Sequence, residues 1–145
     1  MKISAKGQYA LRIMLDLANN NTGEYITIKS IAARQTLPEK YLEQIMTSLL
    51  KAGYVKSVRG SKGGYKLAYD ASKYTVGKIL RVIEGSLSPV AILDEELRAP
   101  MDVGESVTYE VWREVDAAIT KVVDGITLEH LVQRQKDRIG NDYMI

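Results

Sequence analysis

Apolar residues recur at helical spacing in the first part of the chain. Between Ala5 and Asn20 they form a stripe made of Ala10, Leu11, Met14, Leu15 and Ala18. Because an α-helix repeats every 3.6 residues, this stripe predicts one amphipathic helix over that range. The following letters, "NNNTGE", contain the Asn and Gly residues that typically end a helix.

Two shorter helices follow. Thr27 is a suitable N-cap for a helix that we expect to run through Gln35. The stretch "TLPEKYLEQIMTSLLKAG" predicts the next helix, with Pro38 in its first turn and Gly53 just after its end. Its apolar face, expected in the core, comprises Leu42, Ile45, Met46, Leu49 and Leu50. Two helices joined by a few residues are typical of a helix-turn-helix.

A hairpin is expected directly after this pair of helices. Val55–Val58 and Tyr65–Ala68 have the pattern of short strands, and the glycine-rich "RGSKGG" connects them. A Walker-type phosphate loop is the competing interpretation, but that loop needs Gly-Lys-Ser/Thr ahead of a helix, whereas a strand follows here. The order helix, helix, hairpin predicts a winged helix-turn-helix in a mainly α (α+β) fold.

The remainder of the chain predicts three more helices. Thr75 can cap one in "TVGKILRVIEG", Thr108–Asp124 forms a long one, and Thr127 can cap the last, with residues 136–145 as a frayed tail. We expect three parts: a DNA-binding domain at 1–84, a loop at 85–106, and a dimerisation helix with the last helix and tail at 107–145. Because little of the chain is left to cover the long helix, we expect a homodimer formed through Val111, Trp112, Val115, Ile119, Val122 and Val123.

Charge divides the chain into two unlike parts. Residues 1–84 contain 14 Lys and Arg against 6 Asp and Glu, a net charge of +8, whereas residues 85–145 carry −6. A basic half suggests that the first part meets a polyanion, here double-stranded DNA, although chance segregation of surface charge would look the same. Lys6 and Arg12 interrupt any leader-like apolar run and no membrane span is evident, so we expect a cytoplasmic protein without a membrane partner.

Residue types that carry chemistry are scarce. The chain has no cysteine and one histidine, His130, so we expect no enzyme and assign no catalytic residue. Asp94, Glu95 and Glu96 could hold a hard cation, but consecutive carboxylates on a loop are usually solvated. The alternative function is a winged helix used only for protein contact, which would show no salt-dependent affinity for DNA.

Four stretches together resemble a known family. "MKISAKGQYALRIMLDLA", "YLEQIMTSLLKAGYVKSVRGSKGGYKL", "VGKILRVIEGSLSPV" and "ITLEHLV" are similar to the IscR/NsrR/CymR family of bacterial winged-helix regulators, the Rrf-two family. The resemblance runs from Met1 to about Val132. It implies a dimeric transcription regulator, often a repressor, of genes for iron–sulfur assembly, cysteine metabolism or nitric-oxide stress.

The resemblance also assigns roles in DNA binding. It implies that Tyr41, Glu43 and Gln44 lie on the recognition helix, that Arg59 enters a minor groove, and that basic residues near the start approach phosphates. Glu43 would accept a hydrogen bond from a cytosine amino group and disfavour other sequences. The full set of expected DNA contacts is Lys2, Lys6, Thr27, Pro38, Lys40, Tyr41, Glu43, Gln44, Thr47, Arg59, Ser61, Lys62, Gly63, Gly64 and Tyr65.

The chain departs from the family at the cofactor. Many members hold a two-iron two-sulfur cluster through three cysteines in the loop before the long helix, and the equivalent positions here are Ile92, Ala99 and Ser106. Since Ile and Ala cannot ligate iron and Ser is a poor substitute for a thiolate, we expect no cofactor and no metal in this chain. Either the protein binds no cluster, or the chain is an altered form of one that does.

Members without cysteines resemble the repressor of cysteine metabolism, which senses sulfur status through a complex with cysteine synthase. That enzyme is known to accept partner tails that end in isoleucine, and this chain ends "NDYMI". We therefore expect cysteine synthase as a possible partner, with Ile145 entering its active site. A disordered tail without a partner is the alternative.

Overall fold

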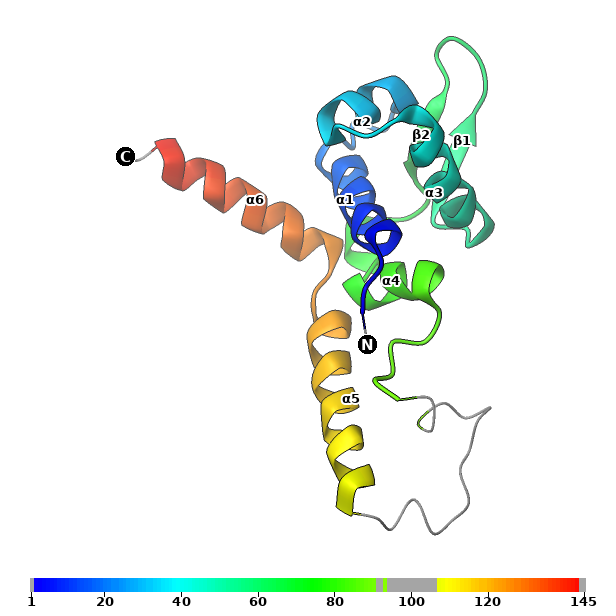
Figure 1. Cartoon of the computed structure of the whole chain (residues 1–145). Coiled ribbons are helices and arrows are strands. Elements are labelled where there is room, and N and C mark those ends of the chain that lie inside the picture. The colour runs from blue at the N-terminus through cyan, green and yellow to red at the C-terminus, as the bar shows by residue number, and fades with distance from the viewer. Residues whose placement is uncertain (1, 91–92, 94–106, 144–145) are drawn as a thin grey trace.

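A computed structural model describes residues 2–90, 93 and 107–143 of the chain. In chain order its elements are α1 (Ala5–Asn19), α2 (Ile28–Gln35), α3 (Glu39–Lys51), β1 (Val55–Val58), β2 (Gly64–Leu67), the 3₁₀ turn η1 (Ala71–Lys73), α4 (Val76–Glu84), α5 (Val107–Gly125) and α6 (Leu128–Tyr143). Figure 1 shows α1 to α4 and the hairpin gathered in one body, with α5 and α6 extending from it. The prediction of a mainly α fold with a winged helix-turn-helix is confirmed.

The helix starts follow the capping residues. The Thr27 hydroxyl accepts a hydrogen bond from the Ser30 N–H at the start of α2, and the Thr75 hydroxyl accepts one from the Lys78 N–H at the start of α4. Pro38 departs from expectation, because it is the N-cap of α3 rather than a residue of its first turn. Its ψ of 137° is extended, so the helix begins one residue later. Gly53 follows α3 with a φ of +75°, as its expected position requires.

The hairpin is fastened to the body of the protein. β1 and β2 pair antiparallel, with Val55 opposite Leu67 and Val58 opposite Gly64, so β2 lies one residue earlier than expected. Ile26, just before α2, exchanges two backbone hydrogen bonds of 2.8 Å with Tyr65. This third extended segment holds the hairpin against the start of α2.

The main core lies between α1, α3, the hairpin and the start of α6. The apolar face of α3 is buried as predicted through Leu42, Ile45, Met46 and Leu49. Leu128, the first residue of α6, is also fully buried in this core. Tyr74 closes the base of the hairpin, because its hydroxyl donates to the Tyr54 carbonyl and accepts from the Tyr69 N–H.

The long helix α5 divides its apolar residues between two uses. Ile119 and Val123 are partly buried against a small apolar cluster that includes residues of α4, so the chain itself covers this part of the expected dimerisation stripe in part. The side chains of Val111, Trp112, Val115 and Val122 are between 38% and 58% exposed. These four residues of the expected dimerisation stripe are therefore open to solvent in a single chain.

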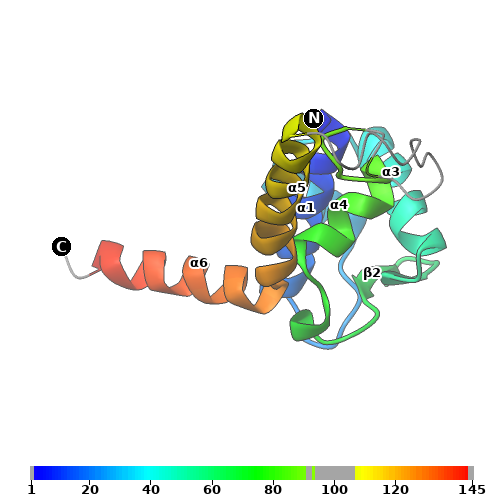
Figure 2. The same cartoon turned by 90° about the horizontal axis from the view of Figure 1, so that it is seen from below.

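The last helix is longer than expected. Residues 136–143, expected as a frayed tail, continue α6 to Tyr143, and Figure 2 shows this helix projecting from the body. Thr127 and His130 exchange hydrogen bonds, each accepting from the other's backbone N–H, which gives α6 a reciprocal cap at its start. Further along α6, the Gln133 side-chain amide donates a hydrogen bond to the Asp137 carboxylate one turn later. This capping gives His130 a structural role.

Candidate nucleic-acid interface

One hollow of about 700 Å³ joins the two elements expected to read DNA. The start of α2, two residues of α3 (Glu43 and Leu50) and the hairpin line it, and these elements lie together at one end of the molecule in Figure 1. Residues expected to contact DNA that line it are Thr27, Glu43, Arg59, Ser61, Gly63, Gly64 and Tyr65. Residues far apart in the sequence thus share a single concave surface.

The tip of the hairpin presents its charge to solvent. Arg59, Ser61 and Lys62 are all exposed. The Gly63 N–H donates to the Gly60 carbonyl across the turn, and Gly60 has a φ of +111° that favours glycine. The hairpin therefore ends in a tight turn that carries the solvent-exposed cations Arg59 and Lys62, as its composition predicts.

Gly63 and Gly64 have a steric role in addition to any contact with DNA. A Cβ atom on Gly63 would collide with the Val58 carbonyl, and one on Gly64 would collide with the Ile26 carbonyl. These two glycines let the hairpin close on itself and approach the segment before α2.

The polar face of α3 is open to solvent. Lys40, Glu43, Gln44 and Thr47 are exposed, and the Thr47 hydroxyl donates to the Glu43 carbonyl at 2.8 Å. Their carboxylate, amide and ammonium groups are types that read base edges or bind phosphates. Exposed Pro38 stands at the beginning of the same helix.

Some other residues expected to contact DNA also make contacts within the protein. Tyr41 is half-buried, with its ring edge-on to the Tyr9 ring at 5.8 Å, and the Tyr65 ring packs against the main core. The Lys6 ammonium is 3.5 Å from the Ser48 hydroxyl of α3, whereas Lys2 is exposed. These contacts brace the interface elements against α1 and the core.

The structure adds residues that the sequence reasoning missed. Lys29, exposed on the first turn of α2, and Ser57 of β1 line the same hollow. The sequence could have indicated Lys29, because it lies two residues after the N-cap Thr27 and residues of the first helical turn lie close to the cap. Lys29 adds a second cation to the hollow that Arg59 lines.

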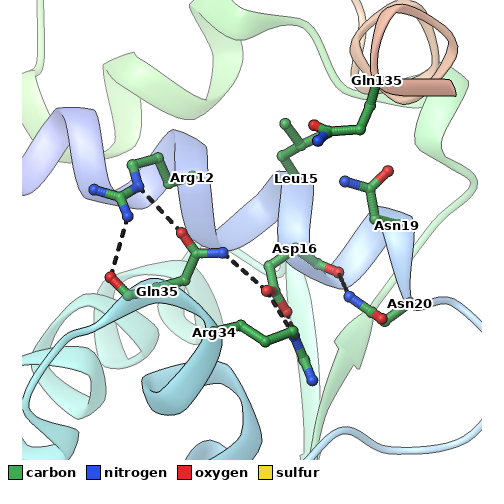
Figure 3. Close-up of a pocket in the computed structure, with 8 residues that line it drawn as sticks. All are labelled: Arg12, Leu15, Asp16, Asn19, Asn20, Arg34, Gln35 and Gln135. Atoms are coloured by element: carbon green, nitrogen blue, oxygen red, sulfur yellow. Dashed lines mark hydrogen bonds and ion pairs between the residues drawn. The ribbon is translucent and has the colours of Figure 1, made fainter. Parts of the chain in front are cut away.

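A polar network fixes α1 against the end of α2, as Figure 3 shows. Asp16 is only 5% exposed, and its carboxylate accepts hydrogen bonds from Arg34 Nε and Nη2 at 2.9 and 2.8 Å. The Gln35 amide donates to the same carboxylate, and Gln35 in turn accepts from Arg12. Hydrogen bonding to Asp16 raises the pKa of Arg34. The network ties α1 to Arg34 and Gln35, the last residues of α2 before the turn that leads to α3.

Comparison with known proteins identifies the family. The model of Rrf2, described as an iron-dependent transcriptional regulator, matches residues 3–134. The chain belongs to the Rrf2 family. It is 43% identical over 131 residues to the HTH-type transcriptional regulator CymR of Bacillus subtilis. The matched region covers 90% of this chain and 89% of CymR. It is 34% identical over 147 residues to the regulator IscR of Yersinia enterocolitica, covering 98% of this chain and 88% of that one.

Solved structures of Rrf2 relatives share the fold. The structure of CymR, the global cysteine regulator of B. subtilis, matches with a TM-score of 0.79 and 41% identity, over 92% of this chain and 98% of that one. IscR of T. potens matches with a TM-score of 0.76 and 40% identity, over 95% and 90% of the two chains. The predictions of a DNA-binding transcription regulator and of a protein that is not an enzyme are confirmed.

The iron dependence of the family raises the question of an iron site here. This Rrf2 member has no cysteine, so it lacks the thiolates that hold an iron–sulfur cluster. Among the described residues, no group of three or more His, Asp or Glu is arranged to hold a metal ion. The positions of Ile92, Ala99, Ser106 and the acidic run 94–96 lie outside the described residues. A thiolate-ligated cluster does not fit this chain.

In the part of the chain that the structure describes, we find no helix with the length and apolar character needed to cross a bilayer.

Proposed function

We propose that this Rrf2 protein is a dimeric repressor of genes for cysteine and sulfur metabolism or iron–sulfur assembly. Its similarity to CymR, a global cysteine regulator, supports the first gene class, and its similarity to IscR supports membership in the same group of regulators. The observation that carries the mode of binding is the shared hollow, where Glu43 of α3 and Arg59 of the hairpin line one surface. A module that binds only proteins is disfavoured by family membership and by the net charge of +8 on residues 1–84.

In this proposal the contacts divide by chemistry. Glu43 and Gln44 read base edges in a major groove, and Arg59 enters the neighbouring minor groove. The ammonium groups near the same surface neutralise phosphates, which supplies affinity without sequence preference. The proposed phosphate contacts are Lys2, Lys6, Lys29, Lys40 and Lys62.

We also propose that residues 1–84 bind DNA, residues 85–106 receive a signal and residues 107–145 form the dimer. The exposed side chains of Val111, Trp112, Val115 and Val122 support the last assignment, because one helix rarely leaves so many large apolar groups in water. A second copy of the same chain would cover them, and a two-fold dimer would bring two reading surfaces to two half-sites.

Titration of DNA from the promoter upstream of its own gene tests this function. We expect two chains per operator. Since five lysines from each chain would neutralise about ten phosphates, the affinity should fall on the order of 10⁵-fold between 50 and 200 mM salt. Fluorescence anisotropy with analytical ultracentrifugation measures both quantities. Val122→Glu is expected to separate the dimer, whereas Ile139→Glu, at an equally exposed apolar position on α6, is the control. Salt-independent binding, or no binding, contradicts the proposal.

A second proposal concerns the end of the chain. Cysteine synthase would capture the terminal Ile145, and similarity to a cysteine regulator favours this partner. In Figure 1 α6 carries the chain away from the body towards its end. Deleting residues 143–145 should abolish binding to cysteine synthase in a pull-down with purified proteins, while operator affinity stays unchanged. Equal capture of the full and shortened chains would refute this idea.

A further inference from the structure

The start of α1 is capped by a residue from another helix. The N-cap Ser4 accepts a hydrogen bond through its hydroxyl from the Gly7 N–H at 3.1 Å, as an N-cap normally does. The Ser4 N–H and hydroxyl both donate to the Glu84 carboxylate, at 2.8 and 2.6 Å. Glu84 is the last residue of α4 and lies 80 positions further along the chain.

These bonds complete a capping box with a carboxylate supplied from outside the helix. In the usual capping box, an acidic residue three positions after the cap accepts from the backbone N–H of the cap. Here that position is Gly7, and the first turn of α1 has no acidic residue. A Cβ atom on Gly7 would collide with the Glu84 carboxylate, so the glycine makes room for the acceptor.

The capped segment lies between α4 and the elements that read DNA. Lys2 precedes Ser4 by two residues and is exposed. Lys6 follows it and contacts Ser48 on α3. Glu84 therefore fixes, from the far end of α4, a short stretch of backbone that carries two cations.

We propose that Glu84 is a positioning residue for the nucleic-acid interface, which caps α1 from α4 and thereby holds Lys2 and Lys6 where they meet phosphates. This inference rests on the proposed function. Because Glu84 is negatively charged, the direction in which its removal changes the affinity for DNA tests this role. A carboxylate near a DNA surface repels the polyanion, so removing it should tighten binding if charge alone mattered. A positioning role predicts instead that DNA binding weakens in a variant that loses both the charge and the oxygen that accepts from Ser4.

The first experiment compares three variants by fluorescence anisotropy with operator DNA. Glu84→Ala should bind more weakly than the wild type by about tenfold or more, with a salt slope smaller by about 0.9 if one of the two lysines loses its phosphate and by about 1.8 if both do. Glu84→Gln keeps an oxygen acceptor for Ser4 and should bind at least as tightly as the wild type. Glu24→Ala, which removes an exposed carboxylate from the turn before α2, controls for charge.

The second experiment uses the glycine. Alanine is the better helix former, so Gly7→Ala should raise the melting temperature if helix propensity decides. We expect it instead to displace the Glu84 carboxylate, lower the melting temperature and weaken DNA binding to the extent that Glu84→Ala does. In the Glu84→Ala background, Gly7→Ala should cause no further loss, because the obstructing carboxylate is gone.

The outcomes separate this inference from the proposed function. Failure of the wild type to bind operator DNA would refute the function. Wild-type binding together with equal or tighter binding by Glu84→Ala would refute the positioning role alone. A lower melting temperature with unchanged affinity and salt slope would show that Glu84 acts only on stability, and additive effects of the Gly7 and Glu84 changes would refute their contact.

Discussion

Arg59→Ala is expected to weaken operator binding by about 1–3 kcal/mol, or roughly 5- to 150-fold in affinity. Arg59 is exposed on the hairpin and lines the hollow that it shares with Glu43. Its guanidinium is long and planar, and a narrow minor groove concentrates the negative potential that attracts such a group. The loss should be largest for the preferred operator, so the ratio of specific to non-specific affinity should fall. Titrations with operator and scrambled duplexes measure both affinities.

Two further substitutions sharpen this test. Arg59→Lys keeps the charge but loses the planar fork, so it should recover non-specific affinity more than specificity. Lys62→Ala, at a neighbouring exposed position, should weaken binding to both duplexes equally and reduce the salt slope by about one. If Arg59→Ala kept the affinity and selectivity of the wild type, the hairpin would have no part in recognition.

Asp16→Ala is expected to lower the free energy of unfolding by about 2–4 kcal/mol. The carboxylate of Asp16 is almost fully buried and accepts from Arg34 and Gln35, so its loss leaves both donors without their partner. Breaking a buried ion pair in this way is among the most destabilising single changes. The Arg34 side chain is 39% exposed, and water can therefore replace part of what it loses. Urea denaturation followed by circular dichroism gives the measurement.

The matched control for this change is Asp124→Ala. Asp124 and Arg81 form a similar pair between α5 and α4, with distances of 2.7 and 3.1 Å, but their side chains are 36% and 38% exposed. Exposed pairs contribute about 0–1 kcal/mol, because water screens them. Equal losses for the two aspartates would mean that burial of Asp16 does not decide the strength of its pair.

These contacts describe how the reading surface is held. The Asp16 network joins α1 to the end of α2, and Glu84 joins the start of α1 to α4. Arg81, one turn before Glu84, joins α4 to α5. Substitutions of Glu84, in the last turn of α4, should therefore affect the elements that read DNA although this side chain does not contact the DNA.

Local patterns in the sequence predicted the elements well. The caps Thr27, Thr75 and Thr127, the buried face of α3 and the glycine-rich hairpin follow from the chemistry of a few neighbouring residues, and the structure contains them. The predictions failed at element ends. Pro38 is an N-cap because its backbone is extended, β2 starts at Gly64 because Gly64 pairs with Val58, and α6 continues to Tyr143.

The sequence by itself determined the class of fold, the polar face of α3 and the cationic tip around Arg59, since helix periodicity, capping and turn chemistry act over short distances along the chain. It also determined that no thiolate can hold a cluster here. Only the tertiary structure decided that Lys29 shares a hollow with Arg59, that Ile119 and Val123 pack against α4, and that Glu84 caps α1. Such contacts join residues tens of positions apart, and no local pattern of side chains encodes which distant groups meet.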